Sequence, residues 1–364
     1  MTQPSPFIWF GGKRRVAALI WDALGDVDNY VEPFIGSGAV LLARPETHAA
    51  RCETVNDADM FLSNFWRALA ADPDGVARWA DWPVNECDLF ARHLWLVNDG
   101  RALLAEHLEQ DPDWHDAKVA GWWVWGLNSW IGSGWCSGKG PWKRAEDTGA
   151  GVNRQLPHLG SAGQGINRQD TGAGVNRKLP HLGDAGQGIN RQDTPADLIA
   201  YFRFLAARLR RVRVCCGDWA RVVTPGAKTY GATVGVFLDP PYDPGIRAKG
   251  VYAVDDDSGG LAVAVREWAI THGADRRLRI VLAGYESEHA DEMATAGWRV
   301  HAYAATAAYQ TAAQAGGSAG NQANRLMERM WFSPHCLVRQ DPLPWGEPDL
   351  APESQQDPAL DPEP

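Results

Sequence analysis

The chain has 364 residues and a mass of 39.8 kDa; 45% of its residues are hydrophobic and 22% are charged. This composition is typical of a globular protein large enough for two structural units, and it excludes a collagen-like, mucin-like or wholly disordered chain. No run of about 18 uninterrupted apolar residues occurs, which argues against a membrane span. The first residues also lack the basic and then apolar pattern of a secretory signal.

The six cysteines form no C-x-x-C pair, and a chain of this size needs no disulfides. We therefore expect reduced thiols and a cytoplasmic protein. The formal charge of −10 argues against a nucleic-acid partner, but its distribution is uneven. Seven acids and no Lys or Arg follow residue 340, and without them the charge is −3. Residues 137–194 carry eight bases and five acids, so this segment is able to meet phosphates locally.

The first 71 residues have an α/β pattern. Phe61, Phe65 and Leu69 recur at i, i+4 and i+8, which predicts a helix with these side chains in the core. The elements expected before it are a helix over 14–24, a strand over 29–34, a tight turn over 35–38, a helix beginning at 39 and a strand over 53–56.

Residues 72–195 differ in composition, since they hold ten of the eighteen tryptophans. They also hold a tandem repeat: segments 147–169 and 170–192 have a period of 23 residues and differ at two positions. Two copies are too few for a self-stabilising solenoid, and their glycine content favours an extended loop. Four equivalent Asn-Arg pairs in the repeats supply Arg154, Arg168, Arg177 and Arg191.

Residues 196–338 return to an α/β pattern. The segment 234–238 is fully apolar, as expected of a strand that is buried on both faces. The other expected elements are helices over 196–209 and 261–271, strands over 212–216 and 279–283, and a closing antiparallel pair over 298–303 and 327–332. We expect a mobile loop over 306–324 and a disordered acidic tail over 339–364.

The segment Asp239-Pro240-Pro241-Tyr242 follows directly after the apolar strand. Two prolines cannot continue a central strand, so they fix the chain where the strand leaves the sheet. Open α/β sheets bind ligands at this carboxyl edge. The carboxylate of Asp239 and the carbonyl oxygen of Pro240 can accept hydrogen bonds from an exocyclic amine, and Tyr242 offers a flat face to a base.

A second segment, EPFIGSG over 32–38, joins the first strand to a helix through a Gly-x-Gly turn. Gly36 and Gly38 permit close approach of a ligand to the backbone. Asp57 follows Gly36 by 21 residues at the end of the next strand, where a ribose-binding acid is expected. The third glycine of the dinucleotide fingerprint is absent, which favours a cofactor without pyrophosphate over NAD.

Five motifs occur in one order: WFGGK over 9–13, EPFIGSG, Asn56-Asp57, Gly217-Asp218 and DPPY over 239–242. With these motifs the chain resembles the DNA adenine methylase family of S-adenosylmethionine-dependent DNA N6-adenine methyltransferases, over about residues 5–70 and 196–335. The resemblance implies an α/β fold with a Rossmann-like methyltransferase sheet, helices on both faces, and an inserted, mainly helical and loop-rich recognition domain. The implied boundaries are 1–71 and 196–338 for the catalytic domain, 72–195 for the recognition domain and 339–364 for the tail.

The resemblance also implies the site residues. The catalytic set is Asp239, Pro240, Pro241 and Tyr242. The cofactor set is Trp9, Gly12, Lys13, Glu32, Phe34, Gly36, Ser37, Gly38, Asp57 and Asp218. In this set Lys13 is expected at the methionine carboxylate, Glu32 near the methionine amine, Asp57 at the ribose and Asp218 at the cofactor adenine. From the residues alone, Phe34 as a core side chain, Asp57 as a helix N-cap and Asp218 as a turn residue remain alternatives.

The expected reaction needs no metal and no covalent intermediate, because a sulfonium is already a strong electrophile. The N6 lone pair of adenine is delocalised, and hydrogen bonds to Asp239 and Pro240 favour a pyramidal nitrogen and accept the developing charge. The adenine must be flipped out of the duplex and stacked on Tyr242. An N4-cytosine enzyme, an RNA adenine enzyme and a silent DNA-binding protein remain alternatives. The absence of a Pro-Cys dipeptide argues against cytosine C5 methylation.

Double-stranded DNA is the expected partner, and the sequence is compatible with a monomer. Asn128 lies in a segment, 125–132, that resembles the start of the family's recognition domain. Asn128 and the four arginines of the repeats are the candidate DNA contacts, by base readout or by phosphate contact. A duplication in a tolerant loop without a role is the alternative for the repeats. The tryptophan cluster is either the core of a small domain or a base-stacking platform.

Overall fold

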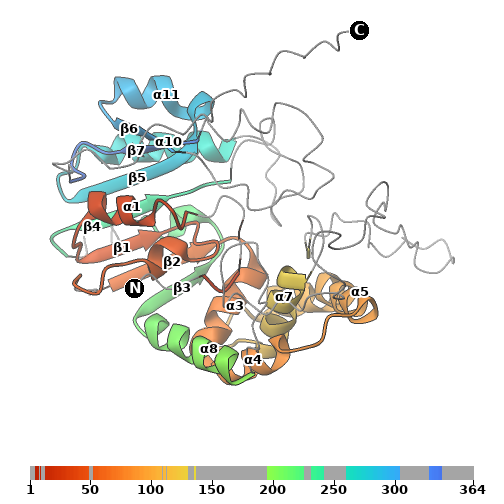
Figure 1. The fold of residues 1–364 in the computed structure, drawn as a ribbon. Helices are drawn as coiled ribbons and strands as arrows, with labels where there is room; N and C mark the ends of the chain where they lie inside the picture. Colours follow the sequence, from red (N-terminus) through yellow and green to blue (C-terminus); the bar gives the residue numbers. More distant parts are fainter. Residues whose placement is uncertain are drawn as a thin grey trace, which may run out of the picture.

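The computed structural model describes residues 5–7, 9, 13–48, 52–108, 110–111, 113–129, 135–136, 195–224, 231–241, 260–303 and 328–337. The seven strands of these residues form one sheet in the order β3-β2-β1-β4-β5-β7-β6 (Figure 1). The strands are β1 Asn29–Glu32, β2 Cys52–Asp57, β3 Val212–Cys216, β4 Val234–Leu238, β5 Leu278–Tyr285, β6 Arg299–Ala302 and β7 Glu328–Phe332. The first five strands in this order are parallel, whereas β7 is antiparallel to both β5 and β6. The predicted α/β fold with a closing antiparallel pair is confirmed.

Helices cover both faces of the sheet. Successive side chains of β4 and β5 point to opposite faces, and on each face they pack into a separate apolar cluster with helices. Phe237, Val281 and Ala283 pack in the cluster that contains residues of α1 Ala17–Leu24, α2 Ala39–Leu42, α3 Met60–Ala71 and α8 Pro195–Leu209. Val236 and Ile280 pack in the cluster of α10 Gly260–Gly273 and α11 Glu286–Thr295. No helix within the described ranges is long and apolar enough to cross a membrane.

Two element ends differ from the sequence prediction. The first strand stops at Glu32 instead of Phe34, because Pro33 has no N–H to continue the ladder. The first helix begins at Ala17 instead of Arg14, since residues 13–16 form a turn in which Val16 N donates to the Lys13 carbonyl at 3.1 Å. The helix then ends at Gly25, whose φ of 65° suits a residue without a side chain.

The segment after α3 is helical and packs on α3 and α8 (Figure 1). Its elements are α4 Pro73–Ala80, α5 Glu86–Trp95, a π-helical turn over Leu96–Gly100, α6 Arg101–His107 and α7 Ala117–Ser129. Its apolar residues join the cluster of α3 and α8, and Trp123 is among the buried ones. For Trp123 and Trp125, both buried, the core interpretation is the better of the two. The proposed domain boundaries stay predictions.

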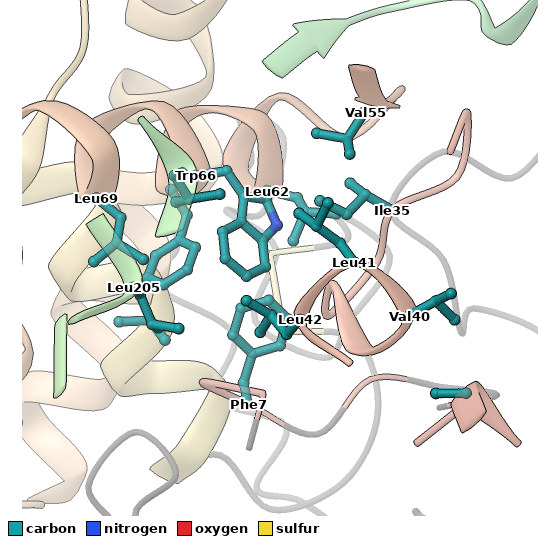
Figure 2. Packing of buried hydrophobic residues seen from close by; sticks show 14 of the residues in the cluster. Phe7, Ile35, Val40, Leu41, Leu42, Val55, Leu62, Trp66, Leu69 and Leu205 are labelled. Carbon is teal, nitrogen blue, oxygen red and sulfur yellow. The ribbon is translucent and has the colours of Figure 1, made fainter. Parts of the chain in front are cut away.

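The tandem repeats, the expected loop over 306–324 and the acidic tail lie outside the described residues. The helices over 86–107 lie in the segment 72–195, which was expected to be mainly helical and loop-rich, but their individual bounds were not predicted. The core residues Phe61, Phe65 and Leu69 are buried as predicted. Figure 2 shows Leu69 in this cluster together with Trp66, Leu62 and Leu205 of α8.

A buried ion network ties β2 to α8 and to the chain after α2. Glu53 of β2 is 1% exposed and accepts hydrogen bonds from Arg208 at 2.6 Å and from Arg44 at 3.2 Å. Arg44 also donates to the Val27 carbonyl at 2.8 Å, so one guanidinium joins the chain before β1 to the start of β2. Breaking such a network leaves charge in the core without its partner, which is strongly destabilising.

We expect Glu53→Gln to lower the free energy of unfolding by about 3–5 kcal/mol, because Arg44 then stays buried without its carboxylate. Asp74→Asn is the matched control, since Asp74 pairs with Arg203 at 2.6 Å on the exposed surface. Urea unfolding followed by circular dichroism measures both variants. Equal midpoints for the two variants would show that the buried network contributes no more than the surface pair.

Candidate active site

The two principal motifs leave the sheet side by side. Strands β1 and β4 are parallel neighbours, with Val31 opposite Val236. The Gly-x-Gly turn follows β1 and the Asp239-Pro240-Pro241 segment follows β4, so both lie at the carboxyl edge. The strand order reverses here, because β2 lies on one side of β1 and β4 on the other. Such a switch point is where open α/β sheets form a binding crevice.

The turn after β1 adopts a conformation that only glycine adopts easily. Gly36 has φ 48° and Gly38 has φ 67°. The Trp66 indole donates to the Gly36 carbonyl at 3.2 Å, and a Cβ at Gly36 would lie 2.6 Å from the Trp9 ring. Ser37 between the glycines is buried. The turn is therefore fixed by two tryptophans, and the predicted residues Trp9, Gly36, Ser37 and Gly38 come together.

Asp57 organises the same turn from the end of β2. Its carboxylate accepts the Gly36 N–H at 3.2 Å and the Asp59 N–H at 3.0 Å. Burial raises the pKa of Asp57 to about 7, and the Asp59 charge adds to this against the backbone hydrogen bonds. The alternative role of Asp57 as a helix N-cap is wrong, because Asp59 caps α3 by accepting the Phe61 N–H at 2.9 Å. Asp57 thus points to the turn and not to the helix.

Asn56 is a site residue that sequence reasoning quoted only as part of a motif. Its amide donates to the Pro33 carbonyl at 3.1 Å and to the Gly217 carbonyl at 3.0 Å, so it joins the carboxyl ends of β1, β2 and β3. Its Oδ1 is buried and has no hydrogen-bond partner within the described part of the chain. The signal available in the sequence was its place directly before Asp57 at a strand end.

An aromatic pair lies on the α10 side of the crevice. Phe34 and Trp219 stack with ring centroids 6.2 Å apart and an interplanar angle of 28°. Both are partly buried against the cluster that contains β4. Asp218 is exposed, and it caps the 3₁₀ turn over Trp219–Arg221 by accepting the Ala220 N–H at 2.7 Å. Trp219 was missed, although its position after the Gly217-Asp218 motif was available as a signal.

The charged residues at this edge pair differently from the prediction, which placed Lys13 at the methionine carboxylate of the cofactor. Lys13 Nζ lies 2.9 Å from Asp239 Oδ1. Burial raises the pKa of Asp239, and the ammonium of Lys13 opposes that rise. Glu32, at the end of β1, accepts a hydrogen bond from the Tyr30 hydroxyl at 3.0 Å. Burial raises the pKa of Glu32 well above its ordinary value, and the nearby charge of Asp239 adds to the rise.

Several predicted site residues are not placed at this edge of the sheet by the described part of the structure. Gly12, Tyr242 and the four arginines of the repeats lie outside the described residues. Asn128 is the last but one residue of α7, and its amide donates back to the Val124 carbonyl at 2.8 Å. Within the described ranges no group of three or more His, Cys, Asp or Glu side chains could hold a metal ion. All six cysteines are free.

Residues 9–83 match the sequence model of the D12 class N6 adenine-specific DNA methyltransferase family. The match covers 75 of the 364 residues, so the chain is similar to this family over its first part. The matched segment contains the Trp9–Lys13 motif, the Gly-x-Gly turn and Asp57, and it ends before the Asp239 segment. No match was found among curated proteins. Similarity to this family implies S-adenosylmethionine-dependent methylation of adenine N6 in DNA.

The residues at the crevice fit S-adenosylmethionine. A Cβ at Gly36 would meet the Trp9 ring and a Cβ at Gly38 the Trp66 ring, so the turn keeps this shape only with glycine. The Asp57 carboxylate at the same edge would suit the hydroxyls of a ribose. The orphaned Oδ1 of Asn56 offers a further acceptor at the same edge. Glu32 is an acceptor for an ammonium group, and the Phe34 and Trp219 rings suit a purine.

Gly36→Ala should weaken S-adenosylhomocysteine binding by about tenfold or more, because the new methyl meets the Trp9 ring and forces the turn to move. Gly297→Ala is the matched control, since Gly297 also has positive φ, at 73°, but nothing lies within 4 Å of its Cβ position. Isothermal titration calorimetry compares the two affinities. Equal affinity in both variants would contradict the role given to the turn.

The affinity for S-adenosylhomocysteine should fall about tenfold from pH 8 to pH 6. Asp57 has a pKa raised to about 7, so its carboxylate is mostly ionised above this pH and mostly protonated below it. An ionised Asp57 would accept both ribose hydroxyls, so binding should be lost as the pH falls. Asp57→Asn should bind weakly with no such pH dependence. A wild-type affinity that stays constant between pH 6 and 8 speaks against Asp57 as the ribose acid.

Proposed function

We propose that methyl transfer takes place in the crevice between the ends of β1 and β4, with Asp239 and the Pro240 carbonyl binding the N6 amine of a flipped adenine. The observation that carries this proposal is the parallel pairing of β1 and β4, which puts the Asp239 segment next to the glycine turn. The proposed amine-binding segment at Asp239 and the proposed cofactor turn at Gly36 are thus adjacent, although they are about 200 residues apart in the chain.

Bound S-adenosylmethionine supplies an electrophilic methyl group on its sulfonium. The chain's own residues hold it: the Gly36–Gly38 turn approaches it closely, Asp57 accepts the ribose hydroxyls, and Phe34 with Trp219 flanks the purine. Glu32 and Lys13 are the candidate partners of the amino acid moiety. Trp9 acts indirectly by packing over Gly36. Gly12 and Asp218 complete the proposed cofactor set.

Asp239 is the main group that stabilises charge on the target amine. Its carboxylate accepts one N6–H and the Pro240 carbonyl the other, which directs the nitrogen lone pair and stabilises the positive charge that develops there. Pro240 is buried and Pro241 partly buried, so the backbone that carries these acceptors is held rigidly. Tyr242 is proposed to stack on the flipped base.

DNA recognition is assigned to residues 72–195. Asn128 at the end of α7 and Arg154, Arg168, Arg177 and Arg191 of the repeats are the proposed contacts, either to bases or to phosphates. We propose a monomer acting on a specific site in double-stranded DNA. The excess of basic residues over 137–194 supports contact with phosphates in a chain that is acidic overall.

Asp239→Asn should lower kcat for N6-methyladenine formation by about a hundredfold or more, because the amide cannot replace a charged acceptor. Binding of S-adenosylhomocysteine should be retained. Asp275→Asn is the control, since Asp275 is a carboxylate next to Arg277 at the opposite edge of the sheet, before β5. Labelled S-adenosylmethionine, duplex DNA and mass spectrometry of the nucleosides measure the product. Full activity of Asp239→Asn, or N4-methylcytosine as the product, would overturn the assignment.

A further inference from the structure

The contact between Lys13 and Asp239 is not explained by a cofactor role for the lysine. Lys13 lies in the turn before α1, at the end of the first motif, whereas Asp239 follows β4. Their 2.9 Å contact joins an ammonium that is 3% exposed to a carboxylate that is 20% exposed. A buried lysine is stable as a cation only beside an anion, so each group depends on the other.

The charges around Asp239 make this cation important. Glu32 at the end of β1 couples electrostatically to Asp239, and burial raises the pKa of both carboxyl groups. Glu328 at the start of β7 also raises the pKa of Asp239, and it accepts the Tyr303 hydroxyl at 2.7 Å. Lys13 is the cation that lowers the pKa of Asp239 against burial and the charge of Glu328.

The geometry of the pair leaves room for substrate. A carboxylate has two oxygens and about four lone-pair positions. Lys13 occupies Oδ1, so Oδ2 is the oxygen that the N6–H of adenine can use. The two prolines fix the backbone after Asp239, but they do not fix the side-chain torsions of Asp239. The contact of Lys13 with Oδ1 limits those torsions.

We propose that Lys13 is a positioning residue for the target base: it holds Asp239 as an oriented carboxylate in the crevice before the adenine enters. This inference rests on the proposed function of Asp239. It gives Lys13 a task in base capture that is separate from any contact of the lysine with the cofactor. The N-terminal motif thereby takes part in both halves of the reaction.

The test compares pH profiles of kcat at saturating cofactor and DNA for the wild type and Lys13→Met. A neutral side chain of similar length removes the charge, so Asp239 keeps its proton to a higher pH. The acid limb of the profile should move upward by about 1 to 3 pH units. Activity should recover toward the high-pH end, and Lys13→Arg should restore most of the wild-type profile.

Binding of S-adenosylhomocysteine, measured on the same proteins at a pH above the acid limb, separates the two roles of Lys13. A variant that binds the cofactor product less well but has an unmoved acid limb would overturn the inference, as would an equal loss of kcat at every pH. Arg203→Met, which removes a surface cation paired with Asp74, should leave both measurements unchanged. Should Lys13→Met not fold, Lys13→Gln carries the same prediction, because its amide donates to Oδ1 without a charge.

The failure of this inference is distinguishable from failure of the proposed function. An inactive wild-type protein, or an Asp239→Asn variant with full activity, removes the proposed function itself. An active wild type that loses activity in Asp239→Asn, with an unmoved acid limb in Lys13→Met, retains the proposed function and removes only the role of Lys13.

Discussion

The parallel pairing of β1 with β4 is the constraint on which the site depends. Side-by-side parallel strands end at the same edge, and here the chain after one strand is a glycine turn and after the other a carboxylate followed by two prolines. The order β2-β1-β4 reverses the direction of winding at this point, so no crossover helix fills the space between the two ends. The geometric result is that the glycine turn and the Asp239 segment lie next to each other at one edge of the sheet.

The residues at this edge of the sheet are linked to one another by hydrogen bonds. Asp57 accepts the N–H of Gly36, Trp66 donates to its carbonyl, and Asn56 joins three strand ends through Pro33 and Gly217. Each of these bonds satisfies a backbone group that the end of a strand would otherwise leave unpaired. The glycine turn is therefore held in one conformation by contacts within the chain, which lowers the conformational entropy lost when a ligand binds.

The balance of charge explains why a lysine lies in the crevice. Glu32 is buried and Asp239 is largely buried, so water stabilises their charges poorly. Lys13 meets Asp239 directly, while Tyr30 donates to Glu32. A cationic cofactor would further favour the ionised carboxylates, so the site is suited to a sulfonium compound and to an amine that gains positive charge. The helical segment over 73–129 contributes to this region through Trp123, which contacts Phe7 and Trp9.

Much of the fold follows from local sequence. The apolar segment 234–238 and the positions of glycine predicted strand β4 and the turn after β1, because these properties depend on side-chain size and on backbone freedom at single positions. The order of the five motifs predicted the resemblance to the family. Asp59 as the cap of α3 and the stacking of Trp219 on Phe34 were decided by tertiary structure. So was the partner of Lys13. A lysine can reach any carboxylate within its length, and only the folding of the β4 end against the first turn brings Asp239 to 2.9 Å from its ammonium.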